Sequence, residues 1–255
     1  MSDTKISESL NILGLIPARM GSSRFPGKPM APILGKPMIG HVYERVSKAP
    51  DLTLTAVATC DEEIAAYIRS IGGTAVLTRN DHDRASDRCA EALKNLEEER
   101  EELFDIVVMV QGDEPMTEPE MIGEVLKPML EDENVQVANL LGKIESEEEL
   151  FDRNCIKVVC NLVGDALYFS RQPIPLWREA DGNEAGKQVC IIPFRRDYLL
   201  EYSSLTPTPL EMVESVDMLR ILEHGGKVKM VPTAYKTYAV DTPLDLKRIE
   251  QMMSA

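Results

Sequence analysis

The stretch ILGLIPARMGSSRFPGK, residues 12–28, begins with an apolar run that ends at Pro17 and continues as a basic segment with two glycines. A short apolar run that stops at a proline is typical of a strand buried on both faces. Further strands are expected at residues 54–59, 74–77 and 105–110, alternating with helices at 37–49, 61–71, 86–102 and 119–131. This alternation predicts an α/β fold with a mostly parallel, Rossmann-like sheet and helices on both faces.

The second half of the chain is less regular. Strands are expected at 135–140, 156–160, 166–169 and 227–231, with one helix from about 210 to 224 and a closing helix at 243–253. We find no internal repeat and no long linker, so we expect a single domain over residues 1–255 with a smaller β-containing lobe inserted at about 140–205. The acidic clusters at 97–102 and 145–149 are expected to be solvated helix faces.

The composition excludes several classes of function. The 255 residues include 28 basic and 43 acidic side chains, a net charge of −15, which disfavours binding to nucleic acid or to an anionic membrane. No apolar run approaches the roughly 20 residues that span a bilayer, and the N-terminus does not resemble a signal peptide, so no membrane insertion is expected. The five cysteines are scattered without a C-x-x-C pair, which indicates reduced thiols in a cytoplasmic protein.

The segment after the first strand has an unusual charge. From Ser9 to Tyr43 there is no acidic residue, while Arg19, Arg24, Lys28 and Lys36 are basic. In an acidic chain, this reversal after a buried strand indicates an anion site, where the glycines let backbone amides approach a phosphate and the serines add donors. The spacing is not that of a Walker A loop, because five residues separate the glycines and a proline follows the lysine. A solvent-facing basic loop is the alternative interpretation.

A second polar loop, residues 111–115, follows the strand at 105–110. Ligands of parallel sheets bind outside the carboxyl ends of the strands, so both loops are expected at one edge. Asp113 lies in this loop, and Asp241 stands at the start of the last helix with Thr242 and Pro243. A turn residue and a helix N-cap are the simpler interpretations of the two aspartates. Brought together, they would suit magnesium, which prefers carboxylate and phosphate oxygens.

Several motifs in order along most of the chain resemble those of a known family. They are LIPAR at 15–19 with S-x-R-x-P-G-K-P at 22–29, VQGDEP at 110–115, N-x-x-KVV at 154–159, ALYFSR-x-PIP at 166–175, the stretch 209–225, and VDTP-x-DL at 240–246. They resemble the signatures of sugar-nucleotide cytidylyltransferases, and most of all those of the CMP-Kdo synthetase family, which activates 3-deoxy-manno-octulosonate (Kdo).

The resemblance implies a nucleotide-diphospho-sugar transferase fold and a homodimer, with the inserted lobe contributing to the acceptor site and the dimer interface. It implies that CMP is transferred from CTP to an acidic acceptor with Mg²⁺ as the cofactor. Asp113 and Asp241 are the metal ligands by this resemblance, and Arg19 and Lys28 complete the expected catalytic set by neutralising the triphosphate.

The binding residues follow from the same resemblance. The expected nucleotide contacts are Ala18, Arg19, Gly21, Ser22, Ser23, Arg24, Lys28, His82, Ser86, Arg88, Gln111 and Asp113. The expected acceptor contacts are Gln111, Arg171, Gln188, Ile192 and Glu214.

Two segments depart from the family pattern. The family's His-x-Ser-Gly-Thr-Asp/Glu-Arg reads HDRASDR at 82–88, which places Arg84 and Ala85 where Ser and Gly are usual. Arg84 would add charge beside the base or the acceptor, or else point to solvent. The family's His-x-Gly-Ile-Tyr-x-Tyr/Phe-Arg reads QVCIIPFR at 188–195, which removes two polar aromatic groups.

The identity of the acceptor therefore stays open at this point. Kdo, a modified or different ulosonate, and a phosphonate all fit the sequence, because each offers an acid with an oxygen nucleophile. A guanylyl- or uridylyltransferase shares the phosphate chemistry, and a noncatalytic nucleotide-binding paralogue is the alternative from another class.

Overall fold

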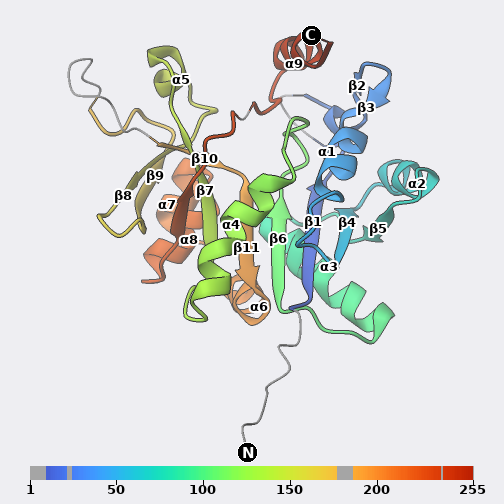
Figure 1. The fold of residues 1–255 in the computed structure, drawn as a ribbon, viewed down its shortest axis with the longest axis horizontal. Helices are drawn as coiled ribbons and strands as arrows, with labels where there is room; N and C mark the ends of the chain where they lie inside the picture. The colour runs from blue at the N-terminus through green and yellow to red at the C-terminus, as the bar shows by residue number, and fades with distance from the viewer. Residues whose placement is uncertain (1–9, 22–24, 177–185, 237, 255) are drawn as a thin grey trace, which may run out of the picture.

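The computed structural model describes residues 10–21, 25–176, 186–236 and 238–254. Its main sheet has five strands in the order β11-β6-β1-β4-β5 (Figure 1). These are β1 (Ile12–Ala18), β4 (Leu54–Thr59), β5 (Thr74–Leu77), β6 (Ile106–Val110) and β11 (Ile191–Arg195). The first four are parallel to one another and β11 is antiparallel to β6. The predicted α/β fold with a mostly parallel central sheet is confirmed.

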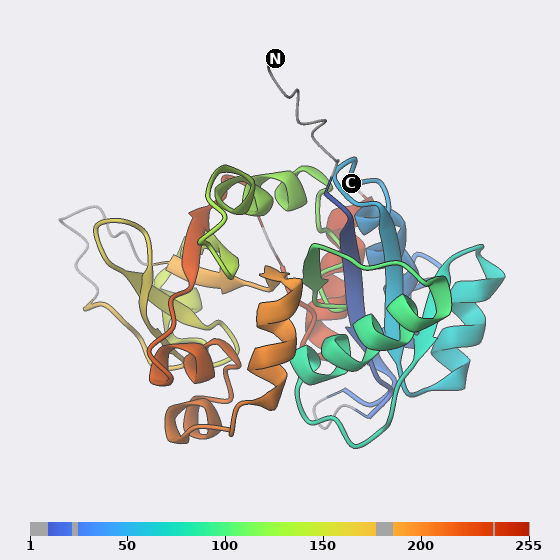
Figure 2. The same cartoon turned by 90° about the horizontal axis from the view of Figure 1, so that it is seen from below.

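Helices cover both faces of this sheet, as the alternating sequence pattern predicts. On one face lie α1 (Met38–Val46), α2 (Glu62–Ser70) and α4 (Glu120–Glu131); on the other lie α3 (Ala85–Arg100) and α6 (Arg196–Ser204) (Figure 2). Strand β1 is buried along its whole length, and its alternate side chains enter two separate cores. Leu13 and Leu15 pack with α3, whereas Ile12 and Ile16 pack with α1. Each such burial contributes about 1.5–3 kcal/mol.

A second five-stranded sheet lies beside the first, in the order β12-β7-β10-β8-β9. Its strands are β7 (Ala138–Lys143), β8 (Lys157–Cys160), β9 (Ala166–Ser170), β10 (Gly186–Val189) and β12 (Lys229–Pro232). The chain passes from β10 into β11, so residues 186–195 contribute to both sheets. The boundaries of the inserted lobe at 140–205 stay a prediction, although strand pairing joins residues 191–195 to the first sheet and 229–232 to the second.

The helix expected at about 210–224 is two helices, which corrects that prediction. α7 (Pro209–Glu214) begins with a capping box between Thr208 and Glu211 and stops at Ser215, whose φ of 53° is left-handed. α8 (Met218–Glu223) starts afresh three residues later. A residue in the left-handed conformation cannot continue an α-helix. The apolar pattern of residues 210–224 therefore continues across a point where the helix is interrupted.

The acidic clusters are only partly solvated, which corrects a second expectation. Glu97 is 8% exposed and accepts two hydrogen bonds from Arg196, at 2.7 and 2.8 Å. The other cluster overlaps a short helix, α5 (Glu147–Phe151), where Glu149 pairs with Lys187. The remaining elements are η1 (Lys28–Met30), the short strands β2 (Pro32–Ile33) and β3 (Lys36–Pro37), and α9 (Pro243–Ser254).

All five cysteines are free thiols. Among the described residues, no helix is both long enough and apolar enough to cross a bilayer.

Candidate active site

The loops that carry the expected chemistry meet at the carboxyl ends of β1 and β6. These strands are parallel neighbours, with Leu15 opposite Met109, so both strands end at the same edge of the sheet. Helix α9 lies above this edge, and α5 of the second sheet's lobe stands across from it (Figure 1). The carboxyl edge of a parallel sheet is where α/β proteins bind ligands.

Lys28 stands between the two aspartates that the sequence singles out. Its Nζ lies 2.9 Å from Asp113 Oδ2 and 3.7 Å from Asp241 Oδ1. It also donates to the carbonyl of Val240 at 2.9 Å, and the amide of Val240 donates to the carbonyl of Asp113 at 2.9 Å. The three charged side chains are only 14–21% exposed. The fold therefore brings residues 28, 113 and 241 into one cluster.

The position of Lys28 depends on the glycine before it. Gly27 has a φ of 74°, in the left-handed region that a side chain rarely adopts. In this conformation its amide donates to the carbonyl of Met20 at 3.0 Å, which closes the basic loop. Lys28 then starts the single turn of η1, directed at the end of β6.

Asp241 is not the cap of the last helix, which corrects the simpler interpretation. The amide and hydroxyl of Thr242 both donate to Asp245 Oδ2 at 2.8 Å, and the amide of Asp245 donates back to the Thr242 hydroxyl at 3.3 Å. The cap thus belongs to Thr242 and Asp245, with Pro243 in the first turn. This arrangement leaves the carboxylate of Asp241 facing Lys28.

Glu114 is a buried carboxyl group that the sequence did not single out. Burial and the neighbouring charge of Asp113 raise its pKa to about 7. Its Oε2 has no hydrogen-bond partner among the described residues. Loop sequence alone does not reveal this burial, because it depends on β11 passing behind the loop at Cys190, whose carbonyl accepts from the amide of Gln111 at 3.0 Å.

The two aspartates fit a divalent cation of the hard type. Their carboxylates already face one positive charge, the ammonium of Lys28, and carboxylate oxygens are the ligands that Mg²⁺ prefers. In the described ranges, no group of three or more His, Cys, Asp or Glu side chains could hold a metal, so this site offers two protein carboxylates. A site with two protein ligands leaves the remaining positions to phosphate oxygens and water.

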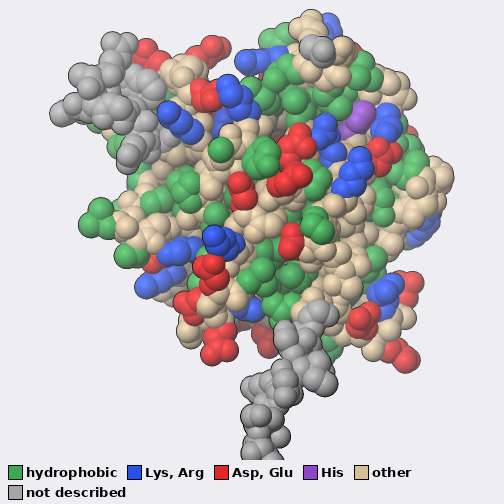
Figure 3. Space-filling model, in the orientation of Figure 1, with side chains coloured by type: hydrophobic (Ala, Val, Ile, Leu, Met, Phe, Trp, Pro, Cys, Tyr) green, Lys and Arg blue, Asp and Glu red, His purple; other side chains and the backbone are tan. Residues whose placement is uncertain are grey.

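A cleft of about 960 Å³ opens beside this cluster. Asp113, Glu114 and Asp241 line it on one side, and β10, α5 and the start of α9 line the others. In the space-filling view, acidic side chains gather in the middle of this face, below the notch between the two upper projections, and basic side chains stand beside them (Figure 3). A cleft of this size and charge suits a polar ligand larger than a single phosphate.

Three of the five expected acceptor contacts lie in the cleft wall: Gln111, Arg171 and Gln188. Gln188 donates from Nε2 to Asn139 Oδ1 at 2.7 Å, which fixes its amide. Arg171 donates to the carbonyls of Glu214 and Ser215 at 2.6 and 3.2 Å.

Glu214 and Ile192 have other environments. The carboxylate of Glu214 accepts from the hydroxyl of Ser170 at 2.9 Å and the amide of Arg171 at 2.8 Å, which ties α7 to β9. Ile192 is 2% exposed in the core beneath α3 and α6. The expectation that Ile192 contacts the acceptor is therefore corrected, because this side chain points into the apolar interior.

The expected nucleotide contacts are only partly described. Arg19 is exposed at the end of β1 and donates to the carbonyl of His82 at 3.3 Å, which joins the first loop to the segment after β5. Ala18 is the last, buried residue of β1, and Gly21 has open space around its α-carbon. Ser22, Ser23 and Arg24 lie outside the described residues.

Ser86 and Arg88 are buried in the first turns of α3. Ser86 donates to Asp217 Oδ2 at 2.7 Å, and Arg88 donates to the carbonyl of Arg79 at 3.1 Å. The side chain of His82 pairs with Glu91. These contacts join the segment 78–88 to itself, to α3 and to the turn before α8, and the cleft lining does not include the three side chains.

Lysines at the rim of the cleft were missed by the sequence analysis. Lys187 pairs with Glu149, and Lys236 lies 3.1 Å from Glu145. Both pairs join segments that are far apart in sequence, so no local pattern reveals them.

The comparisons with known proteins agree with this geometry. A family model described as cytidylyltransferase matches residues 13–230. The 3-deoxy-manno-octulosonate cytidylyltransferases of Geobacter metallireducens and Geotalea uraniireducens are 39% and 41% identical to this chain, covering 96% and 94% of it and 98% of each relative. A solved structure of CMP:2-keto-3-deoxy-manno-octonic acid synthetase complexed with CTP is 40% identical, with a TM-score of 0.87 over 96% of this chain and 98% of that one.

A solved cytidylyltransferase structure from Leptospira borgpetersenii serovar Hardjo-bovis is 18% identical to this chain. Its TM-score is 0.65, over 96% of this chain and 87% of that one, so the two proteins share the fold. The fold and the charged edge of the sheet define a nucleotidyltransferase of the nucleotide-diphospho-sugar transferase type. Within that class, the chain belongs to the CMP-Kdo synthetase family of cytidylyltransferases.

Proposed function

We propose that this enzyme transfers CMP from CTP to Kdo and releases pyrophosphate. The observation that carries the proposal is the convergence of Lys28, Asp113 and Asp241 beside a cleft large enough for a nucleotide. The matched relatives carry the name of this activity, and the similar solved structure is a complex with CTP.

The reaction is a direct displacement at the α-phosphorus of CTP. The anomeric oxygen of Kdo attacks, a new phosphorus–oxygen bond forms, the bond to the β-phosphate breaks, and pyrophosphate leaves with the electron pair. The proton of the attacking hydroxyl passes to solvent. Arg19 follows β1 and Lys28 starts η1 beside the end of β6, where their charges would neutralise the triphosphate and the departing pyrophosphate. Such transfers depend mainly on positioning and electrostatic stabilisation.

We propose that Mg²⁺ is the cofactor and that Asp113 and Asp241 hold it. When bound there, the ion would polarise the α-phosphoryl group and favour ionisation of the acceptor hydroxyl. The carboxylates must then exchange the ammonium of Lys28 for the metal, which frees that ammonium for the phosphates. The fit of two hard carboxylates facing a single positive charge supports this assignment.

The cleft also offers cations to an acidic acceptor. Its lining has eight acidic side chains and five basic ones, and the basic ones are Lys143, Arg171, Lys187, Lys236 and Arg248. Arg171 and Gln111 are the side chains we propose for the carboxylate and hydroxyls of Kdo. The departure from the family pattern at Ile192 has no direct bearing on the acceptor, because that side chain is in the core. Gln188, another departure in the same segment, lies in the cleft wall, so the support for Kdo comes from the names of the matched relatives.

We propose further that the enzyme is a cytoplasmic homodimer. Free thiols at all five cysteines suit a reducing compartment. Strand β9 is at the edge of the second sheet, where Leu162, Val163 and Leu167 are 61–106% exposed. Apolar groups of this size at an unpaired edge are a common place for contact between subunits.

The direct test is product formation from CTP, Kdo and Mg²⁺, followed as pyrophosphate release and as CMP-Kdo by mass spectrometry. A panel with a modified ulosonate and a phosphonate checks the acceptor, and thermal shift with CTP, UTP and GTP checks the base, because a ligand of the native state raises its stability. Turnover of another acid without CMP-Kdo would reject Kdo. CTP binding without pyrophosphate release with any acceptor would reject catalysis.

A further inference from the structure

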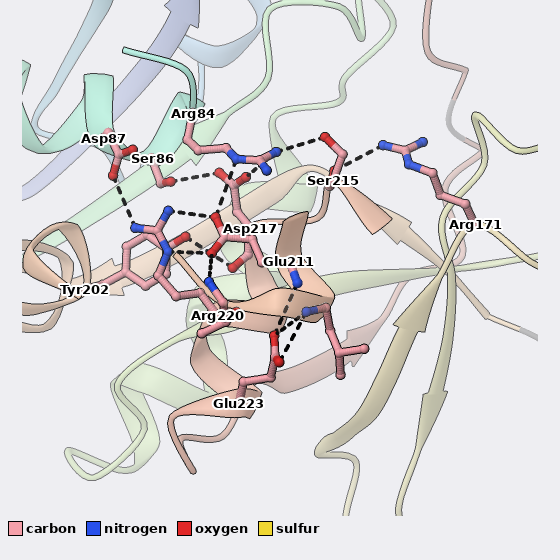
Figure 4. Close-up of polar contacts among 12 residues, drawn as sticks. Arg84, Ser86, Asp87, Arg171, Tyr202, Glu211, Ser215, Asp217, Arg220 and Glu223 are labelled. Atoms are coloured by element: carbon pink, nitrogen blue, oxygen red, sulfur yellow. Dashed lines mark hydrogen bonds and ion pairs between the residues drawn. The ribbon is translucent and has the colours of Figure 1, made fainter. Parts of the chain in front are cut away.

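Arg84 is half-buried between the segment that follows β5 and the turn between α7 and α8. It directly precedes α3, and its side chain is 17% exposed. The sequence offered two placements for it, beside the ligands or out in solvent, and the structure contradicts the second. Its guanidinium instead faces α7 and the turn before α8 (Figure 4).

The contacts of Arg84 are polar and converge on one turn. Nη1 donates to Ser215 Oγ at 2.9 Å and lies 3.7 Å from Asp217 Oδ1, and Nε lies 3.4 Å from Glu211 Oε1. Arg84 thereby joins the segment after β5 to the break between α7 and α8. The two segments are 131 residues apart in sequence.

Charge explains why an arginine suits this place. The cluster holds three carboxylates, those of Asp87, Glu211 and Asp217, and Arg220 is the other cation in it. Glu211 is fully buried and already accepts two hydrogen bonds from Arg220, at 2.6 and 2.8 Å. Without Arg84, three carboxylates would share a single arginine. A second cation compensates a charge that burial makes costly.

Ser215 connects this cluster to the cleft. Its hydroxyl accepts from Arg84, while its carbonyl accepts from Arg171 at 3.2 Å. The carbonyl of the preceding residue, Glu214, accepts from Arg171 Nε at 2.6 Å. Figure 4 shows Ser215 between the two arginines. Because Ser215 has a left-handed backbone that a serine does not favour, its conformation depends on such outside contacts.

The other end of the connection reaches the nucleotide side. Arg84 is two residues from His82, whose carbonyl accepts from Arg19 at 3.3 Å. Arg19 belongs to the basic loop at the end of β1. Hydrogen bonds at each end of the segment 82–84, joined by its backbone, therefore connect the nucleotide loop to the turn that holds Arg171.

We propose that Arg84 is a positioning residue that sets Arg171 for the acceptor by holding the turn at Ser215. This inference rests on the proposed function for the identity of the acceptor. Arg84 touches neither the aspartate cluster nor the cleft lining, so its effect passes through Ser215 and not through direct contact with a substrate.

The test compares Arg84→Ala with its partner variant Ser215→Ala. Loss of one hydrogen bond to a charged group corresponds to about a tenfold change, so each variant should raise the KM for Kdo about tenfold and leave the KM for CTP within about twofold. The double variant should match the single variants, because both remove the same contact. Arg84→Lys should raise the KM for Kdo less than Arg84→Ala does, since lysine restores the positive charge but lacks the planar guanidinium with its several donors.

Lys94→Ala is the matched control. Lys94 is exposed and lines the same second cavity, of about 860 Å³, as Arg84 and Ser215, so this variant removes a positive charge there without touching the turn. It should leave both KM values unchanged. An unchanged KM for Kdo in folded Arg84→Ala, equal rises for both substrates, or additive effects in the double variant would each overturn the proposal.

Hydrogen exchange supplies a readout that does not depend on the acceptor. In Arg84→Ala, amides of residues 212–217 should exchange faster than in the wild type, while those of β1 should not change. Wild-type enzyme that makes no CMP-Kdo would reject the proposed function alone, and exchange would still decide the role of Arg84. Unchanged exchange at 212–217 would overturn that role.

Discussion

The ammonium of Lys28 lies 2.9 Å from a carboxylate oxygen of Asp113, although 85 residues separate them in the chain. The same ammonium is 3.7 Å from Asp241. A lysine that bridges two carboxylates keeps them together when no other cation is bound, since two like charges in a partly buried site repel each other. Lys28 therefore holds together the two carboxylates that we propose as ligands of Mg²⁺.

Replacement of either aspartate should remove catalysis and preserve the fold. Asp113→Asn and Asp241→Asn keep the shape of the side chain but remove the negative charge that would hold Mg²⁺. We expect pyrophosphate release to fall by about a hundredfold or more, by analogy with the loss of a single electrostatic contact in a catalytic site. Circular dichroism and thermal unfolding should stay close to the wild type. Turnover near the wild-type rate in either variant would contradict the metal assignment.

Removal of the metal should separate CTP binding from catalysis. With EDTA, turnover should stop and the rise in Tm caused by CTP should shrink, because the bound triphosphate loses the cation shared with residues 113 and 241. Added Mg²⁺ should restore both. In Asp241→Asn the rise in Tm with CTP should depend less on Mg²⁺ than in the wild type. An undiminished shift in EDTA would mean that the nucleotide binds without the metal.

The thiols should differ in reactivity according to burial. Burial raises the pKa of Cys89 and of Cys190, so each stays a protonated thiol near neutral pH, and the thiolate is the reactive form. Cys60 is half-buried, as are Cys155 and Cys160, and burial also raises the pKa of the latter two thiols. Iodoacetamide at pH 8 should therefore modify Cys60 first, as peptide mapping would show, and the slower thiols should speed up as pH rises. In urea all five should react. Labelling of Cys190 as fast as that of Cys60 in native protein would refute this ordering.

The buried ion pair between Arg220 and Glu211 should be essential for stability. Arg220 is 2% exposed, its guanidinium also lies 4.7 Å from the centre of the Tyr202 ring, and Glu211 is fully buried. Arg220→Ala leaves an uncompensated carboxylate, so we expect the free energy of unfolding to fall by about 3–5 kcal/mol in urea titrations. Lys127→Ala removes an exposed pair with Glu131 and should cost less than about 0.5 kcal/mol. Equal losses would show that burial does not decide the cost.

The edge of the second sheet should decide the oligomeric state. Leu167→Glu places a charge on the exposed apolar face of β9, and we expect the mass measured by light scattering to fall from that of a dimer to that of a monomer. Leu103→Glu is the control, because Leu103 is 65% exposed in the loop before β6, away from β9. A monomeric wild type, or a dimer that survives Leu167→Glu, would reject this interface.

The parallel strands were predictable because burial on both faces leaves continuous apolar runs, as in β1 and β6. Strands β10 and β11 were not predictable. The sequence of β10, GKQV, has no apolar run. β11 contains Pro193, which is tolerated because β11 is an edge strand of its sheet. The break at Ser215 was also hidden, because neither glycine nor proline marks it. In each case a tertiary contact overrides the local pattern.

The features of the candidate site also fall into those that the sequence predicts and those that depend on tertiary packing. Single motifs pointed to residues 28, 113 and 241, but their convergence depends on the order of the strands and on the path of the chain before α9. The buried state of Glu114, the core position of Ile192 and the inward direction of Arg84 depend on packing between distant segments. Sequence reasoning therefore identified the charged residues that converge more reliably than it identified the side chains packed around them.

The shared stretch at residues 186–195 has a consequence for biosynthesis. The first sheet receives its last strand only when residue 195 is available, and the second sheet only when residue 232 is. A ribosome-bound chain of 180 residues thus exposes an unpaired edge of β6 that β11 later covers. No single cut separates the two sheets, because residues 138–195 contain strands of both, and proteins completed by such late, long-range pairings fold slowly.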